Sequence, residues 1–430
     1  MNQVLRRNNW MVALAVGALL GGAGDLALVS AAQAQRSKSD DSKDKDKEPK
    51  HTVSKNAAKP LKAAQDAMQA KKYPDAIQHL KEAEGVAGKT PWDEHLINEM
   101  YGYVYGHTND YPNAAKAFEA LVNDQYTEPS EIPTDLKVLT QINYQLKNYD
   151  KAIDFGQRAI KAGVADENTE TIVSQSYYLK NDFKGTIKFV GAQVDDDIKK
   201  GHEPKEQTLN LILSSCLKLE DQECTSKALE RMVAYYPKPE YWGNLVITLF
   251  QAPSMNDKSL LNTYRLANEV DVMKRPDDYT EMAQLAIEQG SPGEAQHVLE
   301  KAFQRNVFTD PRSQDKNKRL LASAEKAAQQ DQAALAKIAS DAETAPTGDK
   351  SVGVGLAYLG YQQYDKASDF ISKGITKGGL KNEPEAHLLL GIAQLKSGKK
   401  EEAVKSFKAV KGDPNLERIA NLWSLHAKQA

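Results

Sequence analysis

The chain carries a repeating pattern of small and bulky apolar positions that begins near residue 60 and ends near residue 412. In each copy a small residue is followed twelve positions later by a second small residue. An aromatic residue often stands three positions before the second one, and an apolar residue often stands four positions after it. The clearest copies are the pairs Ala64/Ala76, Gly102/Ala114, Ala283/Ala295, Gly355/Ala367 and Gly391/Ala403, and the weaker copies are Thr140/Ala152 and Ser174/Thr186.

This pattern predicts pairs of antiparallel helices. Two such helices approach closely only where both carry small side chains, and twelve residues span the end of one helix, a turn and the start of the next. Residues four and seven positions further on stay on the same helical face, where they can meet the neighbouring pair. Residues that stop or cap helices stand at the expected turns, at 107–110, 147–148, 288–292 and 396–399.

The spacing of the copies predicts further hairpins in the two long gaps. Visible neighbours are roughly 34–38 residues apart, which is the length of one helical hairpin. The gap before Ala295 leaves room for two divergent hairpins, over 208–236 and 238–273. The gap after it leaves room for one more, over the Ala-rich segment 316–342, with a break near Gln330 and Asp331. About ten hairpins are therefore expected.

The first 34 residues have the three parts of an export signal. Arg6 and Arg7 are followed by an apolar run over 11–20, and Ala32-Gln33-Ala34 is a small-x-small cleavage pattern. A membrane anchor is the alternative, but Asp25 interrupts the stretch of ~20 apolar residues that it would need. The sequence therefore predicts a signal peptide over 1–34, a periplasmic mature chain and no stable membrane insertion after cleavage.

Residues 35–59 are expected to be a disordered charged linker. The segment RSKSDDSKDKDKEPK, over 36–50, contains no apolar residue that could offset the entropy of ordering it. Over the whole chain, 56 Lys and Arg balance 59 Asp and Glu. A protein that binds phosphate backbones needs a surplus of cations, so this balance argues against a nucleic-acid partner.

The two cysteines, Cys216 and Cys224, leave two interpretations open. On one continuous helix eight residues rise ~12 Å, which is beyond the ~7 Å Cα limit for a disulfide. A turn at 220–222 would fold the two ends together and allow a bridge, which an oxidising periplasm favours. The alternative is a pair of buried thiols.

No catalytic or metal-binding pattern stands out. The eight histidines are scattered, with no two at i, i+3 or i, i+4, and there is no metalloprotease, P-loop or serine-hydrolase motif. The sequence therefore predicts a protein that is not an enzyme and has no metal site and no cofactor.

These repeats resemble the tetratricopeptide repeat family, over about 60–412. The resemblance implies an all-α, right-handed superhelical solenoid of about ten antiparallel helical hairpins. Its parts are N-terminal hairpins over 60–203, divergent hairpins over 204–275 and C-terminal hairpins over 276–412. Over 204–275 the small-residue pair is lost, so a Sel1-like or HEAT repeat is an alternative there. Residues 413–430 are expected to form a capping helix that covers the last hairpin, with Leu416, Ile419 and Trp423 on one face.

The resemblance also implies a binding face. In that family the first helix of each hairpin lines a concave surface, and contacts come from residues one and four after the small residue. Here those residues are Tyr103, Gln141, Tyr144, Gln175, Tyr178 and Gln284, followed towards the C-terminus by Leu356, Leu359, Ile392 and Leu395. Tyr and Gln suit an extended peptide, while packing inside a tight superhelix is the alternative and is favoured for the Leu and Ile residues.

The function expected from these features is that of a periplasmic, non-catalytic scaffold that binds a protein or peptide of the cell envelope. In the general character of its sequence, notably over 235–242, the chain is also similar to periplasmic repeat proteins that accompany TonB-type energy transduction. The alternative function is a component of polysaccharide or cell-wall assembly that binds a glycan or a synthase. Aromatic residues beside carboxylates would favour a sugar, whereas Tyr with Gln favours a peptide.

Overall fold

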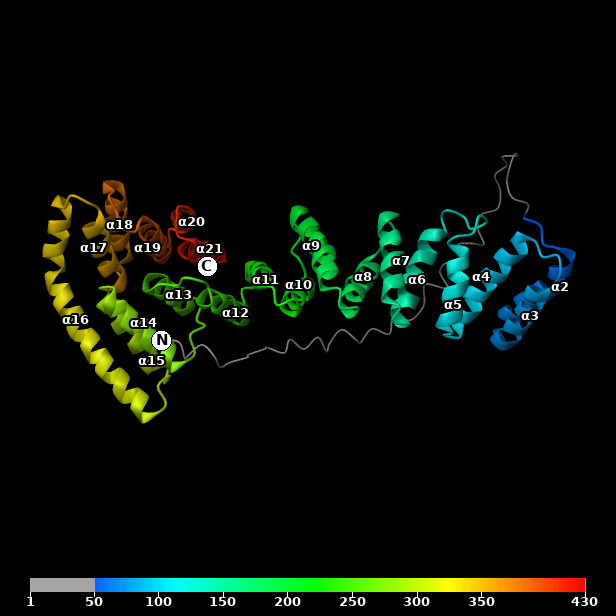
Figure 1. Cartoon of the computed structure of the whole chain (residues 1–430), viewed down its shortest axis with the longest axis horizontal. Helices are drawn as coiled ribbons and strands as arrows, with labels where there is room; N and C mark the ends of the chain where they lie inside the picture. The colour runs from blue at the N-terminus through cyan, green and yellow to red at the C-terminus, as the bar shows by residue number, and fades with distance from the viewer. Residues whose placement is uncertain (1–50, 430) are drawn as a thin grey trace. The chain divides into compact units, whose positions relative to one another are not determined.

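The computed structural model describes residues 51–429, which form twenty helices and no strand (Figure 1). The all-helical repeat fold expected from the sequence is confirmed. The chain divides into two compact units, one ending at Gly201 and the other beginning at His202. The predicted signal peptide and most of the predicted linker lie outside the described residues.

The first unit is a row of four helical hairpins. Each hairpin packs on the next one along the chain. The helices are α2 (Lys55–Gln69) with α3 (Tyr73–Gly85), α4 (Pro91–His107) with α5 (Tyr111–Leu121), α6 (Ile132–Gln145) with α7 (Tyr149–Lys161), and α8 (Glu167–Leu179) with α9 (Phe183–Lys199).

The second unit contains five hairpins and two single helices. Its hairpins are α10 (Glu206–Lys218) with α11 (Gln222–Tyr235), α12 (Pro239–Phe250) with α13 (Asp257–Glu269), α14 (Pro276–Glu288) with α15 (Pro292–Gln304), α17 (Asp349–Gly360) with α18 (Tyr364–Lys377), and α19 (Glu383–Lys396) with α20 (Lys400–Lys408). The single helices are α16 (Pro311–Thr344) and α21 (Pro414–Gln429). The two hairpins expected over 208–236 and 238–273 are both present.

One expected hairpin is wrong. The segment 316–342 lies within the single 34-residue helix α16, with no break at Gln330 or Asp331. The segment contains neither Gly nor Pro, and its alanines favour a continuous helix. Asp331 also accepts a hydrogen bond of 2.6 Å from the Tyr361 hydroxyl, which ties the middle of α16 to the turn after α17. Residues 51–429 therefore hold nine hairpins.

The expected linker also extends too far. Residues 55–59 are the first turn of α2, because Ser54 caps this helix by accepting a hydrogen bond from the Ala57 backbone. Ala57 is fully buried, and Pro60 lies inside the helix. The first hairpin therefore begins at Lys55, five residues before the predicted boundary at residue 60.

The turn between the two helices of each hairpin contains a residue in the left-handed backbone conformation. This geometry ends the first helix and lets the chain reverse. The nine residues, one for each hairpin, are Lys71, Asn109, Lys147, Asn181, Glu220, Ser254, Gly290, Gln362 and Gly398. Four of them lie within the turns that the repeat pattern indicates, and Glu220 lies in the turn considered at 220–222.

The small residues of the repeat make room for a bulky side chain of the same hairpin. A Cβ atom on Gly391 would lie 2.4 Å from Cε1 of Phe407, the apolar residue four positions after Ala403. Gly156 departs from the repeat pattern for a similar reason. A Cβ there would lie 2.2 Å from a methyl group of Val173, which comes from the next hairpin. The close packing of adjacent helices therefore fixes these glycines.

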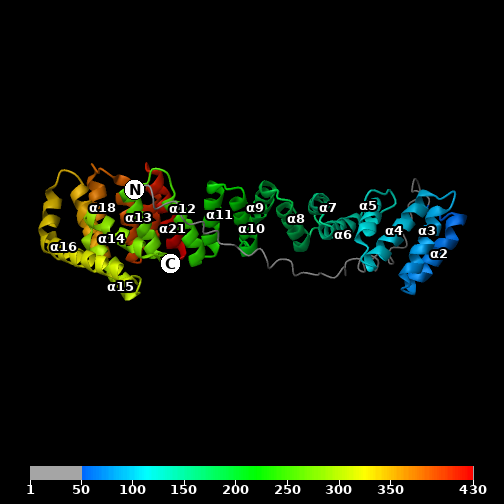
Figure 2. The ribbon, with the colours of Figure 1, turned by 60° about the horizontal axis from the view of Figure 1, so that its bottom comes forward.

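The last helix closes the second unit on itself. α21 packs on α20, as a capping helix should, and it also contacts α11, α13 and α19. Figures 1 and 2 show it beside α13 from two directions. Arg418 donates hydrogen bonds of 2.6 Å to the hydroxyls of Ser226 and Thr248. The last helix of the second unit is therefore hydrogen-bonded to helices near the start of the same unit.

Cys216 and Cys224 lie on either side of the turn between α10 and α11. Their Cα atoms are 5.4 Å apart and their sulfurs form a disulfide. The turn is the feature that makes this geometry accessible, because α10 ends at Lys218 and α11 begins at Gln222. The bridge links the two helices of this hairpin.

A count of free thiols tests the bridge. We expect the chain, denatured without a reductant, to show no reactive thiol, and to show two after reduction, because both cysteines are paired. The measurement is titration with a chromogenic thiol reagent under both conditions. Two reactive thiols before reduction would contradict the disulfide.

Candidate functional site

Five of the six predicted peptide-binding residues lie on first helices of the first unit. They are Tyr103 on α4, Gln141 and Tyr144 on α6, and Gln175 and Tyr178 on α8, and we call them the Tyr/Gln face. All five side chains are partly buried. The sixth residue, Gln284, is exposed on α14 of the second unit.

The structure brings two of these residues into contact. The Tyr144 hydroxyl donates a hydrogen bond of 2.6 Å to Oε1 of Gln175, which joins α6 to α8. Burial and the neighbouring Tyr149 raise the pKa of Tyr144 above its ordinary value, so the phenol stays protonated as a donor. This bond fixes the orientation of the Gln175 amide.

The other two tyrosines of the face rest on neighbouring aromatic rings. Tyr103 packs against Tyr73 with ring centroids 6.4 Å apart, and against His107 at 4.0 Å. Tyr178 meets the edge of Phe183 at 5.4 Å. Each ring is therefore held by a residue at the first turn of a second helix or at the end of its own helix. Tyr103 belongs to a different aromatic group from Tyr144.

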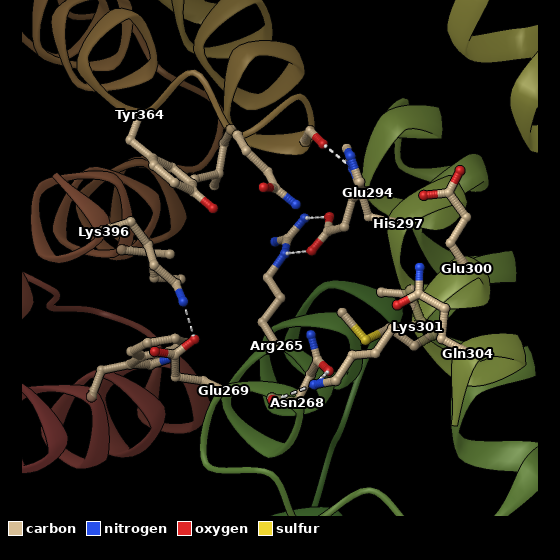
Figure 3. Close-up of a pocket in the computed structure, with 17 residues that line it drawn as sticks. Arg265, Asn268, Glu269, Glu294, His297, Glu300, Lys301, Gln304, Tyr364 and Lys396 are labelled. Carbon is tan, nitrogen blue, oxygen red and sulfur yellow. Dashed lines mark hydrogen bonds and ion pairs between the residues drawn. The ribbon is translucent and has the colours of Figure 1, made fainter. Parts of the chain in front are cut away.

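The second unit contains a cavity that the sequence did not predict. Its volume is about 360 Å³, and its walls come from α13, α14, α15, α17, α18, α19 and α21 (Figure 3). The polar lining residues are Arg265, Asn268, Glu269, Glu294, His297, Glu300, Lys301, Gln304, Gln362, Tyr364 and Lys396. Two residues of the predicted Leu/Ile set, Leu359 and Ile392, also line it.

A buried ion pair forms one wall of this cavity. The Arg265 guanidinium donates two hydrogen bonds to the Glu294 carboxylate, at 2.8 and 2.7 Å, and a third of 2.9 Å to Asn262. Only 5% of the Arg265 side chain is exposed. Burial lowers the pKa of Arg265, but the attraction of Glu294 outweighs it and raises the pKa above its ordinary value.

A second charged group lies on the same helix. Glu269 on α13 pairs with Lys396 of α19, and His426 of α21 lies 3.4 Å from the same carboxylate. Burial raises the pKa of Glu269, but the hydrogen bonds from His426 and Lys396 outweigh it and lower the pKa to about 2. Glu269 therefore joins three helices, including the closing helix α21.

This arrangement predicts an acid-sensitive second unit. The pKa of Glu269 is lower in the folded chain than its ordinary value of 4.5. The stability that the ionised carboxylate adds to the folded state is therefore fully present above pH ~4.5 and is lost as the pH falls towards 2. The shift corresponds to roughly 3 kcal/mol of stability near neutral pH. We expect Glu269→Gln to be less stable than the wild type at pH 7, by an amount that shrinks below pH 4.5. Urea unfolding at a series of pH values measures this, and a difference that is constant from pH 7 to pH 2.5 would contradict the role of Glu269.

The only sequence signal of the cavity is a stripe of polar residues along α13. In α13 the polar residues Lys258, Asn262, Arg265 and Glu269 recur at helical spacing, in a helix whose other positions include Leu261 and Leu266. Such a stripe is commonly a solvated face. Here it faces other helices, since Lys258 pairs with Glu385 at 2.8 Å.

Within residues 51–429 no group of three or more His, Cys, Asp or Glu side chains is placed to hold a metal ion. None of the described helices is both long enough and apolar enough to cross a membrane.

A tetratricopeptide repeat family model matches residues 61–129, which include most of α2 and all of α3, α4 and α5. This match supports the tetratricopeptide resemblance of these hairpins. No curated protein matches the chain.

Several solved structures are similar to the chain. A tetratricopeptide repeat protein from Parabacteroides merdae is 10% identical, with a TM-score of 0.27, over 77% of this chain and 98% of that one. The TPR2AB domain of yeast Sti1, solved in a complex with pHSP90, is 14% identical, with a TM-score of 0.23, over 70% and 100%. The TPR domain of P58(IPK) is 11% identical, with a TM-score of 0.22, over 87% and 98%.

Proposed function

We propose that this chain is an exported, non-catalytic scaffold of the tetratricopeptide repeat type that binds an extended protein segment along the Tyr/Gln face. The observation that carries the proposal is the hydrogen bond between Tyr144 and Gln175, which orders polar groups on two successive first helices. Tetratricopeptide repeats generally act as protein-interaction scaffolds, and a repeat model matches residues 61–129 within the first unit.

The chemistry of the face suits a main chain in extended form. Each tyrosine offers a large flat surface with one polar end, and it loses little side-chain entropy on binding. The bond from Tyr144 uses the amide oxygen of Gln175, so its Nε2 group is a donor for a backbone carbonyl of the bound segment. The face is partly buried before binding, which limits the ordering cost.

The proposed location is the periplasm, and the partner is a protein or peptide of the cell envelope. The support is the signal-like sequence over 1–34, with Arg6, Arg7 and the cleavage pattern at Ala32-Gln33-Ala34. A role beside TonB-type energy transduction is the narrower form of this proposal. Fractionation of cells that express the full chain tests the location, and recovery of the uncleaved chain in the cytoplasm would contradict it.

Removing the three tyrosine rings of the face is expected to weaken partner binding strongly. We expect the triple variant Tyr103→Ala, Tyr144→Ala, Tyr178→Ala to bind the proteins that the wild-type chain recovers at least about 100-fold more weakly, because the loss of even one buried tyrosine anchor costs about 2 kcal/mol or more. The measurement is crosslinking and pull-down from envelope extract, followed by titration of each recovered partner.

Two matched variants separate binding from folding. Tyr177→Ala changes the residue next to Tyr178, but Tyr177 packs on Phe189 and bonds to Gln157 of α7, so partner binding should persist. The triple Tyr→Phe variant keeps the rings and should bind more tightly than the alanine variant. If the folded alanine variant still recovers every partner, the Tyr/Gln face is not the binding site.

A further inference from the structure

The cavity of the second unit is electrically balanced by its own residues. Arg265 of α13 pairs with Glu294 of α15, and Glu269 of α13 pairs with Lys396 of α19, so the two pairs join three helices. A charged ligand that binds to one of these four residues would displace its partner and leave that partner buried without an opposite charge, which is costly. A neutral ligand avoids that cost.

The remaining lining groups form a mixture of donors and acceptors. Lys301 donates to the backbone and side-chain oxygens of Asn268, at 3.2 and 2.7 Å. Glu300 accepts a bond of 2.7 Å from Gln296, and its second oxygen is a further acceptor. The amides of Gln304 and Gln362 offer both kinds of group. Ligand hydroxyls suit such a lining, because each of them donates and accepts.

His297 adds an acceptor. Its Nδ1 lies 3.1 Å from the Gly360 carbonyl oxygen, which can only accept, so Nδ1 carries the hydrogen. In the neutral ring the other nitrogen, Nε2, is then an acceptor. The protein backbone thus selects the tautomer of a residue in the cavity wall.

Aromatic side chains complete the lining. The Tyr364 hydroxyl points into the space between Lys396 and Arg265 in Figure 3. Trp423 also lines the cavity, and its buried indole Nε1–H has no hydrogen-bond partner within the described residues. A buried donor without a partner is uncommon in a folded protein, and a small shift of the indole would offer it to a ligand oxygen.

The geometry points to a second, small-molecule site in this cavity, one that binds a neutral saccharide. The combination of Tyr364 with carboxylates and amides, and the absence of net charge in the lining, are what such a ligand requires. A volume of about 360 Å³ lies within the ~300–1,000 Å³ range of small-molecule sites. This site is separate from the proposed protein-binding face, because every residue of it belongs to the second unit.

Titration calorimetry of the intact exported chain tests the site. The probes are glucose, N-acetylglucosamine and their β-1,4-linked disaccharides, with glucose 6-phosphate and glucosamine as the anionic and cationic comparisons. We expect saturable binding of at least one neutral probe and at least about tenfold weaker binding of both charged comparisons. Tyr364→Phe and Gln304→Ala should each weaken binding by about tenfold, since each removes one hydrogen-bonding group.

The control variant is Tyr358→Phe, which changes a tyrosine of α17 that stacks on Phe370 and is not in the cavity lining. Saccharide affinity should not change in this variant. Three results would disprove the site. The first is that no neutral probe binds at 20 mM, which is about twenty times a weak Kd of ~1 mM. The others are that a charged comparison binds as tightly as the neutral probe, or that both cavity variants keep the wild-type affinity. The Tyr/Gln-face alanine variant should still bind the saccharide, so failure of one proposal does not imply failure of the other.

Discussion

Replacing Trp423 by alanine is expected to destabilise the second unit by about 3–5 kcal/mol. Trp423 is one of the largest fully buried side chains in the chain, with 1% of its surface exposed. It stacks on Phe407 of α20, with ring centroids 6.1 Å apart, and it lies on the helix that closes the unit. Its removal would leave a cavity at the junction of α20 and α21.

Chemical denaturation followed by circular dichroism measures this loss. Asn421→Ala is the matched control, because Asn421 is an exposed residue of the same helix, and its stability should stay within about 0.5 kcal/mol of the wild type. A Trp423→Ala variant as stable as this control would show that α21 does not pack as described.

Replacing Arg265 by methionine is expected to destabilise the second unit by about 3–5 kcal/mol, because it leaves the Glu294 carboxylate buried without its partner. Only 5% of the Arg265 side chain and 16% of the Glu294 side chain are exposed. The double variant Arg265→Met, Glu294→Leu removes both charges and should recover most of the loss. Thermal and urea unfolding of four proteins, the wild type, Arg265→Met, Glu294→Leu and the double variant, gives the interaction energy as a double-mutant cycle.

An exposed ion pair provides the control for this cycle. Lys227 and Glu223 pair on the surface of α11, with 70% and 79% of their side chains exposed. Lys227→Met should leave the unfolding midpoint unchanged, because water screens such pairs. If the double variant at Arg265 and Glu294 were as unstable as the single one, the loss would come from packing and not from an unpaired charge.

The fold was largely predictable because its signals are local. The small residues of one hairpin lie twelve positions apart, and the helix-ending residues stand between them, so each hairpin can be read from about three dozen residues. The failure at α16 has a local cause as well. Its polar residues Gln330 and Asp331 resemble a turn, but a helix without Gly or Pro continues through them, and the contact that holds Asp331 comes from Tyr361, thirty residues away.

The candidate sites were predictable only in part. The helical register places Tyr144 and Gln175 on first helices, although their mutual hydrogen bond depends on the packing of two hairpins. Apart from the polar stripe of α13, the cavity could not be read from the sequence, because its walls are distant in the chain. Lys258 and Glu385, which pair near it, are 127 residues apart. The return of α21 to α11 and α13, together with the ion pairs between α13 and α19, closes this part of the molecule, and no short-range pattern encodes these contacts.

The closing contact also makes one helix important to both stability and binding. α21 contributes Trp423 to the cavity wall and His426 to the charged group around Glu269. A change that releases α21 would therefore weaken the second unit and open the cavity together, while the Tyr/Gln face lies in the other unit. The saccharide proposed for this cavity should in turn raise the unfolding midpoint of the second unit when it binds.

The most direct test of this account is hydrogen exchange of the backbone amides of α21, measured by mass spectrometry on the intact chain. A helix that fastens the end of the second unit to its beginning should exchange as slowly as α13, and both should speed up together in Trp423→Ala. Rapid exchange over 414–429 in the wild-type chain, like that of a frayed terminus, while α13 stays protected, would contradict the closed second unit.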